Sequence, residues 1–253
     1  MERKLILITN DDGIAAPGIR NLVEVARELA DIIVVAPDSP QSGKGHAVTL
    51  STPLRIHKVN VFTDIESYEC TGTPVDCVKL AMDVVLKNRK PDLCVSGINH
   101  GSNASINILY SGTVSAAMEA SLEGTTAIGF SLLDYSFDAN FEPAKPFIKT
   151  IIKDGLEGKF GKGALLNVNI PNLPREELKG IKYCRQGDAR WQEEFVEAVD
   201  PRGQKYYWMT GKFVQKKENG GSDLEALENG YISVVPSMHD LTDYGLLKKL
   251  NKE

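Results

Sequence analysis

The chain has 253 residues, of which 42% are hydrophobic and 25% charged, and its formal net charge is −5. This composition is ordinary for a folded protein with a sizeable core, and the length allows one large domain or two small ones. The net negative charge argues against a broad nucleic-acid-binding surface and against attraction to anionic membranes, although a local basic pocket for a phosphate is compatible with it. We therefore expect neither a nucleic-acid polymer nor a membrane as partner.

The sequence shows no export or membrane signal. The apolar run Leu5–Ile8 is too short for the core of a signal peptide, and no later run approaches the roughly 18 apolar residues of a membrane span. The 4 cysteines form no Cys-x-x-Cys pair, so we expect reduced thiols in the core rather than a zinc site or disulfides. These features predict a cytoplasmic protein.

The first half of the chain alternates between predicted strands and helices. The strands are continuous apolar runs, as expected for parallel strands that helices bury on both faces. One helix start is supported by Thr73-Pro74, which places a cap residue before a proline. This alternation predicts a doubly wound α/β fold with a mainly parallel sheet. The predicted elements are strand Leu5–Thr9, helix Pro17–Ala30, strand Ile32–Ala36, helix Pro74–Leu86, strand Leu93–Ser96, helix Thr113–Leu122 and strand Thr126–Ser131.

The pattern changes towards the end of the chain. Residues 45–71 contain two extended stretches that predict a β-hairpin or an edge extension, and a helix near Pro143–Gly158 and a strand Leu165–Ile170 complete a core of residues 1–171. We interpret residues 172–253 as a smaller β-rich extension with a terminal helix of about ten residues, not an independent domain. Its short pieces cannot form a complete core, which predicts at least a dimer. They are Lys182–Cys184, Phe195–Val199, Tyr206–Met209 and Ile232–Val235.

Two adjacent aspartates, Asp11 and Asp12, directly follow the first predicted strand. Asn-Asp-Asp-Gly is good turn chemistry, so the residues alone leave a turn and a ligand site as alternatives. Position favours a site, because open α/β sheets bind ligands outside the carboxyl ends of their strands. Neighbouring carboxylates repel each other, and burying either is costly unless a cation or donors compensate. We therefore expect a bound cation.

Three other polar segments are predicted at the same edge: PDSPQSGKGH, GINHGSN and YSGTV. Their hydroxyl and amide oxygens, like carboxylates, are hard ligands that suit magnesium, manganese or calcium rather than zinc. The Ser111-Gly112-Thr113 turn opens a predicted helix, and the unpaired N–H groups of a helix N-terminus bind anions such as phosphate. The alternative is that Ser111 or Thr113 merely caps the helix.

Other phosphate and hydrolase motifs are incomplete. Residues 42–45 (SGKG) lack both the preceding glycine and the following hydroxyl residue of a P-loop, and neither G-x-G-x-x-G after the first strand nor G-x-S-x-G is present. The 4 histidines have no evident triad partner. We expect His57 at the surface, and His46, His100 and His239 as loop residues that form hydrogen bonds.

Together these segments resemble the SurE family of stationary-phase survival proteins and 5'/3'-nucleotidases. The resemblance implies a Rossmann-like fold, a metal-dependent phosphomonoesterase that acts on nucleoside monophosphates, and a C-terminal part exchanged in homodimers or homotetramers. Both 5'- and 3'-nucleotides, and short polyphosphate, remain open as substrates. The matching segments span residues 5 to about 209, with a weaker match at DLTD; they are ILITNDDGIAAPGI, VVAPDSPQSG, TGTPVDCV, PDLCVSGINHGSN, YSGTVSAAMEA and DPRGQKYYW.

The resemblance also implies roles for individual residues. One Mg²⁺ or Mn²⁺ per subunit would be held by the positions that match the family's metal ligands, here Asp11, Asp12, Ser42 and Asn99. Asp11 and Asp12 are also the implied catalytic residues: one orients or deprotonates the attacking water, or is itself attacked to give an aspartyl-phosphate. We assign the phosphate oxygens to Asn103, Ser111, Gly112 and Thr113.

Two rival interpretations differ in their chemistry. A phosphatase of the haloacid-dehalogenase type requires D-x-D after the first strand, whereas here Asp11 and Asp12 are adjacent and Gly13 follows. A non-catalytic nucleotide-sensing module would use the same loops without turnover. Metal-dependent release of phosphate from a nucleotide separates an enzyme from such a module.

Overall fold

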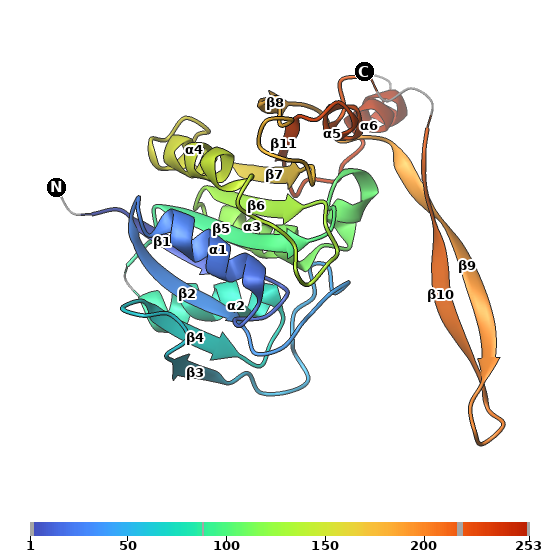
Figure 1. The fold of residues 1–253 in the computed structure, drawn as a ribbon, viewed down its shortest axis with the longest axis horizontal. Coiled ribbons are helices and arrows are strands. Elements are labelled where there is room, and N and C mark those ends of the chain that lie inside the picture. The colour runs from blue at the N-terminus through green and yellow to red at the C-terminus, as the bar shows by residue number, and fades with distance from the viewer. Residues whose placement is uncertain (1–2, 88, 217–219, 252–253) are drawn as a thin grey trace.

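The structure is a computed structural model that describes residues 3–87, 89–216 and 220–251. Figure 1 shows a large sheet with helices on both faces and a long two-stranded hairpin standing apart from it. The sheet has nine strands in the order β3-β4-β2-β1-β5-β6-β7-β11-β8. The strands of this sheet are β1 (Leu5–Thr9), β2 (Asp31–Pro37), β3 (Ile56–Val59), β4 (Glu66–Cys70), β5 (Leu93–His100), β6 (Ala127–Leu132), β7 (Leu165–Ile170), β8 (Ile181–Tyr183) and β11 (Ile232–Ser237).

The sheet is mainly parallel, which confirms the predicted α/β fold. Strand β1 pairs in parallel with β2 and β5, and β4, β6 and β7 continue the parallel part. Strand β3 is antiparallel to β4, so the hairpin predicted within residues 45–71 forms at this edge. At the other edge, β11 lies antiparallel to β7 and parallel to β8. The carboxyl ends of β1, β2 and β5 therefore share one side of the molecule.

Helices cover both faces of the sheet, because alternate residues of the buried strands point to opposite sides. Ile6 and Ile8 of β1 are in the core cluster that includes α1 and α4, whereas Leu5 and Leu7 pack towards α2 and α3. The helices are α1 (Pro17–Ala26), α2 (Pro74–Leu80), the π-helix η1 (Ala81–Leu86), the 3₁₀-helix η2 (Ser105–Leu109), α3 (Gly112–Leu122), α4 (Lys145–Leu156), α5 (Asp223–Glu228) and α6 (Tyr244–Asn251).

Several element boundaries differ from the predictions. Helix α1 ends at Ala26 instead of Ala30. The N–H groups of Leu29 and Ala30 both donate to the Ala26 carbonyl, so the chain forms a turn there before β2 begins. Strand β5 continues to His100 rather than ending at Ser96. The helix predicted over Pro74–Leu86 is an α-helix followed by a π-helix, and its predicted start is confirmed by the Thr73 cap.

The C-terminal segment 172–253 divides between the sheet and the hairpin. Strands β8 and β11 join the main sheet, where Ile232 and Val234 are fully buried. The hairpin consists of β9 (Ala189–Val199) and β10 (Lys205–Gln215), two strands of 11 residues each that extend well beyond the predicted pieces. The terminal helix α6 has 8 residues.

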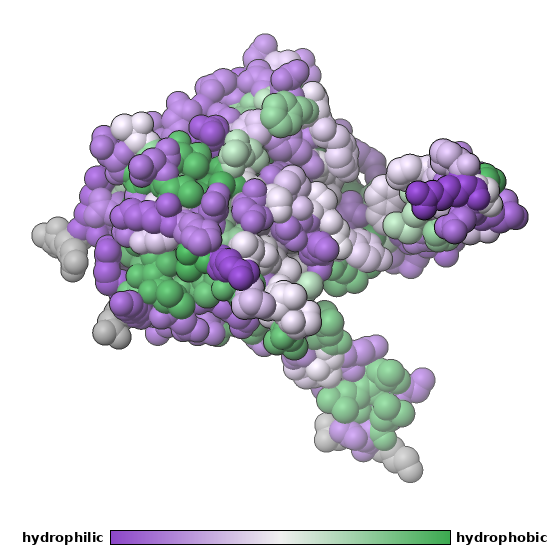
Figure 2. Space-filling model, turned by 90° about the horizontal axis from the view of Figure 1, so that it is seen from below, coloured by the Kyte–Doolittle hydropathy of each residue, from purple (hydrophilic) through white to green (hydrophobic). Residues whose placement is uncertain are grey.

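The hairpin contacts the core near its base and then projects from it. Trp191 donates from Nε1 to Asn107 Oδ1 at 2.8 Å and packs its ring against Phe213. Beyond this base, Figures 1 and 2 both show the hairpin as a lobe that stands clear of the core, and Figure 2 shows hydrophobic as well as hydrophilic residues on its surface. Its exposed apolar side chains include Phe195, Val196, Val199, Tyr206, Tyr207, Trp208 and Met209.

Two predictions from composition can be compared with the structure. All four cysteines are free; Cys70, Cys77 and Cys94 lie in the core as predicted, whereas Cys184 is only partly buried. Within the described residues, no helix has the length and apolar character needed to cross a membrane.

Candidate active site

The loop after β1 is in direct contact with the loop that follows β2, with the end of β5 and with the start of α3. The Asp11 carbonyl oxygen accepts a hydrogen bond of 2.7 Å from the Gln41 N–H, and the Ile14 N–H donates to the Pro37 carbonyl at 2.9 Å. These bonds join the β1 and β2 loops. Because the carboxyl ends of parallel strands lie at one edge, the polar segments predicted to converge there do so.

Asp11 lies against the N-terminus of α3. Its side chain is buried, and Oδ1 accepts a hydrogen bond from the Thr113 hydroxyl. A Cβ atom placed on Gly112 would be 2.7 Å from Asp11 Cβ, so glycine is required at this contact. Ser111 Oγ accepts from the Val114 N–H at 3.0 Å, which shows that Ser111 caps α3. The helix start and the first aspartate therefore form one packed unit.

Asp12 lies beside the end of β5. This half-buried side chain accepts a hydrogen bond at Oδ2 from the His100 N–H at 3.4 Å. Asn99, the preceding residue, belongs to β5 and pairs with Ser131 of β6, beyond a register shift that starts at Ser96. The prediction that Asn99 lies in a loop is therefore wrong, because the pairing with β6 continues past the irregularity. Its Nδ2 donates to the Gly101 carbonyl at 2.9 Å.

Both aspartates have a raised pKa. Burial, and secondarily the charge of Asp12, raise the pKa of Asp11 from 3.8 to about 6, against the opposing hydrogen bond from Thr113. Burial also raises the pKa of Asp12, while the charge and the N–H of His100 lower it. Two neighbouring carboxylates in a buried setting favour either a proton or a cation between them.

The remaining predicted residues differ in their surroundings. Ser42 is exposed and follows Gln41, whose N–H is bonded to Asp11. Asn103 is buried at the ends of β6 and β7: its Nδ2 donates to Ser131 Oγ, and its N–H donates to Asn169 Oδ1, both at 2.8 Å. The side chain of Asn103 is thus fixed by the sheet rather than by the aspartate loop.

The donor set beside Asp11 fits a hard divalent cation. Two carboxylates, a hydroxyl and an amide oxygen are the ligands that Mg²⁺ and Mn²⁺ prefer. Next to Asp11, the buried Asn10 Oδ1 has no hydrogen-bond partner among the described residues. Across the described residues, no cluster of three or more His, Cys, Asp or Glu side chains is arranged for a metal ion. A cation at the aspartate pair would therefore need the hydroxyl and amide oxygens as well.

A pocket of about 440 Å³ opens beside the aspartate pair. Asp12, Asp38 and His100 line it together with Tyr135 and Phe137 from the segment after β6. Tyr135, Phe137 and Asp38 were not among the predicted site residues. The only signal for the two aromatic residues was their position after a predicted parallel strand, which places them at the carboxyl edge of the sheet.

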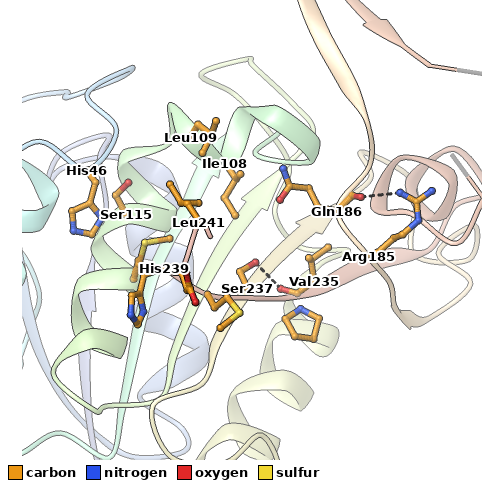
Figure 3. Close-up of a pocket in the computed structure, with 14 residues that line it drawn as sticks. His46, Ile108, Leu109, Ser115, Arg185, Gln186, Val235, Ser237, His239 and Leu241 are labelled. Carbon is orange, nitrogen blue, oxygen red and sulfur yellow. Dashed lines mark hydrogen bonds between the residues drawn. The ribbon is translucent and has the colours of Figure 1, made fainter. Parts of the chain in front are cut away.

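A second pocket, of about 470 Å³, lies beside α3 and contains none of the predicted site residues. In the close-up of Figure 3, Leu241 of the C-terminal segment lies below Ile108 and Leu109, with His46 and Ser115 to one side. His46 Nε2 is 2.8 Å from Oε2 of the buried Glu119, so the prediction of a hydrogen-bonding role for this histidine is confirmed.

The fold and the residues at its strand ends define an α/β protein with a candidate ligand site at the carboxyl edge of its sheet. A family model described as "Survival protein SurE" matches residues 6–193. The chain is 59% identical over 252 residues to a protein named 5'-nucleotidase SurE of Christiangramia forsetii, which covers 99% of this chain and 96% of the relative. A protein of the same name from Cytophaga hutchinsonii is 56% identical, over 100% of this chain and 98% of the relative.

A solved structure agrees with these sequence relatives. The crystal structure of the SurE protein from Aquifex aeolicus matches with a TM-score of 0.83 and 41% identity, over 98% of each chain. The chain therefore belongs to the SurE family, as its motifs predicted.

Proposed function

We propose that the protein is a 5'-nucleotidase, a phosphomonoesterase that hydrolyses nucleoside monophosphates to nucleoside and phosphate. The observation that carries this proposal is the contact between the buried Asp11 carboxylate and Thr113 at the N-terminus of α3. This contact places a candidate cation ligand next to a helix N-terminus that can bind an anion. The relatives named 5'-nucleotidase SurE, which match nearly the whole chain, support it.

The proposed cofactor is one Mg²⁺ or Mn²⁺ per subunit, held by Asp11, Asp12, Ser42 and Asn99. When bound, a divalent cation neutralises charge on the phosphate oxygens and makes water a better nucleophile. Asp11 is kept in place for this role by the Thr113 hydroxyl, and Asp12 by the His100 N–H. Both carboxylates would be ionised once a cation compensates their repulsion.

The proposed phosphate contacts come from Asn103, Ser111, Gly112 and Thr113. The first-turn N–H groups of α3 provide partial positive charge for the phosphate oxygens. The absence of a side chain at Gly112 leaves the helix start close to Asp11. Asp12, which lines the neighbouring pocket, either orients the attacking water or accepts the phosphoryl group itself. A rapid burst of nucleoside release before steady turnover would favour the second route.

The proposal is tested with purified protein that has been treated with a chelator and then dialysed. Phosphate release is measured from 5'- and 3'-nucleoside monophosphates and from short polyphosphate, with magnesium, manganese or calcium restored separately. We expect release from 5'-nucleotides only after a metal is restored. Nucleotide binding without release under any of these conditions would contradict the proposal and favour the nucleotide-sensing module.

We also propose that the protein is a homodimer or homotetramer assembled through the β9–β10 hairpin. A two-stranded ribbon has no interior of its own, and this one exposes a series of large apolar side chains, among them Trp208 and Met209, which are 63% and 71% exposed. Burial of this surface by a second copy would stabilise the hairpin.

A further inference from the structure

We propose that the pocket beside Asp12 is the nucleoside subsite, in which Tyr135 and Phe137 form the surface against which the base of the substrate lies. The inference rests on the proposed 5'-nucleotidase function and adds to it the residues that recognise the leaving group. The pocket volume of about 440 Å³ is within the usual range for small-molecule sites. Its lining includes Asp12, so a group bound there is next to the proposed site of reaction.

The two aromatic side chains are exposed although they are held at the rim of the site. Tyr135 is 75% exposed and Phe137 is 77% exposed. The Tyr135 ring lies directly over Gly101, where an added Cβ atom would come within 2.3 Å of its Cε1. Exposed aromatic faces beside a reaction site are suited to stacking with a flat, partly apolar group.

Hydrogen bonds hold this aromatic segment against the end of β5. His100 Nδ1 donates to the Ser136 carbonyl at 2.8 Å, between the two aromatic residues, and the His100 ring packs edge-on against Phe141. Asn172 Nδ2 donates to Asp134 Oδ2 at 2.9 Å. The segment is therefore attached to the strand that carries Asn99, which places Tyr135 and Phe137 beside the proposed metal ligands.

The charge of the pocket selects a nucleoside rather than a further phosphate. Asp12 and Asp38 contribute carboxylates, and neither lysine nor arginine occurs among the described residues that line it. A polyphosphate chain would be repelled there, whereas ribose hydroxyls can donate to a carboxylate. Asp38 follows β2, the position from which acidic residues bind ribose hydroxyls in other doubly wound folds. The pocket therefore favours nucleoside monophosphates over nucleotides with longer phosphate chains.

Stacking on an aromatic ring also predicts broad base tolerance, because every base presents a π-face. The Tyr135 hydroxyl is not needed for this contact. Tyr135→Phe should therefore behave like the wild type, and Tyr135→Ala should not. This pair of variants separates loss of stacking from loss of a hydroxyl group.

The experiment compares kcat/KM for AMP with kcat/KM for ribose 5-phosphate, which lacks the base. It uses the full-length, metal-loaded protein and the variants Tyr135→Ala, Phe137→Ala, their combination and Tyr135→Phe. Each alanine variant should lose roughly 5- to 150-fold on AMP and less than about twofold on ribose 5-phosphate. Tyr183→Ala removes an aromatic side chain that is 56% exposed on β8, away from the pocket lining, and should change neither value.

An equal loss on both substrates, or no loss on either, would overturn the proposed subsite. If the wild-type protein hydrolyses neither substrate, the proposed function is wrong. Calorimetric titration with adenosine then still tests whether the pocket binds a nucleoside. Adenosine that binds the wild type but not the double alanine variant would support it. Adenosine that binds both equally, or neither, would refute it.

Discussion

The Thr113 hydroxyl donates a hydrogen bond to the buried Asp11 carboxylate, although 102 positions separate the two residues in the chain. This bond joins the end of the central strand β1 to the first turn of α3. It also stabilises the ionised carboxylate, which burial and the neighbouring charge of Asp12 oppose. The geometry of the candidate site thus depends on a residue that the sequence analysis assigned to phosphate binding.

Replacement of Thr113 by valine keeps the shape of the side chain but removes the donated hydrogen bond. Bonds to charged groups contribute about 1.5–3 kcal/mol, so we expect the affinity for Mn²⁺ at neutral pH to fall roughly 10- to 100-fold. Thr113→Ser retains the hydroxyl and should retain most of the affinity. Calorimetric titration of both variants tests this, and equal affinity in Thr113→Val and wild type would contradict it.

Replacement of Asp12 by asparagine removes one charge with almost no change in shape. We expect Asp12→Asn to lose divalent-ion affinity and nearly all phosphatase activity. Without metal, its free energy of unfolding should change little or increase, because the repulsion between Asp11 and Asp12 is relieved. Asparagine and aspartate serve almost equally well in turns. Full activity in this variant would therefore favour the turn interpretation over a metal site.

The stability of the metal-free protein should depend on pH through Asp11. Its pKa is raised to about 6 from 3.8, so between these values the folded state binds a proton that the unfolded state has released. The stabilising contribution of the protonated form is complete below about pH 4 and is lost as the pH rises through 6. The raised pKa of Asp11 therefore contributes about 3 kcal/mol to the free energy of unfolding at low pH.

Urea unfolding between pH 4.5 and 7.5 in the presence of chelator measures this effect. The difference in free energy of unfolding between wild type and Asp11→Asn isolates the contribution of Asp11 from that of other titrating groups. If the two proteins show parallel pH profiles, Asp11 does not titrate in this range.

Substitution of Gly112 by alanine should disturb the site through a direct collision. The added Cβ atom would lie 2.7 Å from Asp11 Cβ, so either the aspartate or the helix start must move. We expect kcat/KM to fall by at least about tenfold, since small displacements of catalytic groups have large effects. Gly220→Ala is the matched control, because an added Cβ there meets nothing within 4 Å. Unchanged kinetics in folded Gly112→Ala would remove this contact from the site.

The proposed assembly through the hairpin predicts an effect of charge on its apolar surface. Trp208→Asp should shift the protein towards the monomer in light scattering at micromolar concentration, because it places a carboxylate in the proposed interface. Leu50→Asp changes a side chain that is 90% exposed outside the hairpin and should not alter the mass. A monomeric wild-type protein would refute the proposal directly. C-terminal truncations made to test the assembly should remove only residues after Ser237, because β11 belongs to the main sheet.

The sequence predicted the elements whose pattern is set by burial. Strands β1 and β7 were predicted with their observed bounds, and β2 and β6 to within one residue at each end, because parallel strands covered on both faces need continuous apolar runs. The hairpin strands were predicted only in part. Polar residues such as Gln192 and Glu194 lie outside the predicted strand Phe195–Val199, because a ribbon exposed on both faces lacks a periodic pattern.

The site could be predicted only where chemistry and position coincide in short segments. Asp11 and Asp12 were selected because two carboxylates after a buried strand are unusual, and the structure places them at the carboxyl edge. The contacts of Tyr135 with Gly101 and of His100 with Ser136 could not be predicted, since they depend on the conformation of an irregular segment. The buried hydrogen bonds of Asn103 to Ser131 and Asn169 could not be predicted either, because they depend on the positions of β6 and β7.

The pairing of β11 between β7 and β8 has a consequence for how the chain is made. During synthesis, β7 leaves the ribosome with no neighbour on one side, and its partner is complete only when Ser237 has been added. At about 5–20 residues per second, this interval lasts several seconds. Throughout it an apolar strand edge is open to other nascent chains. Ribosome-associated chaperones that shield such edges should therefore have their largest effect on the yield of this protein during translation of its last quarter.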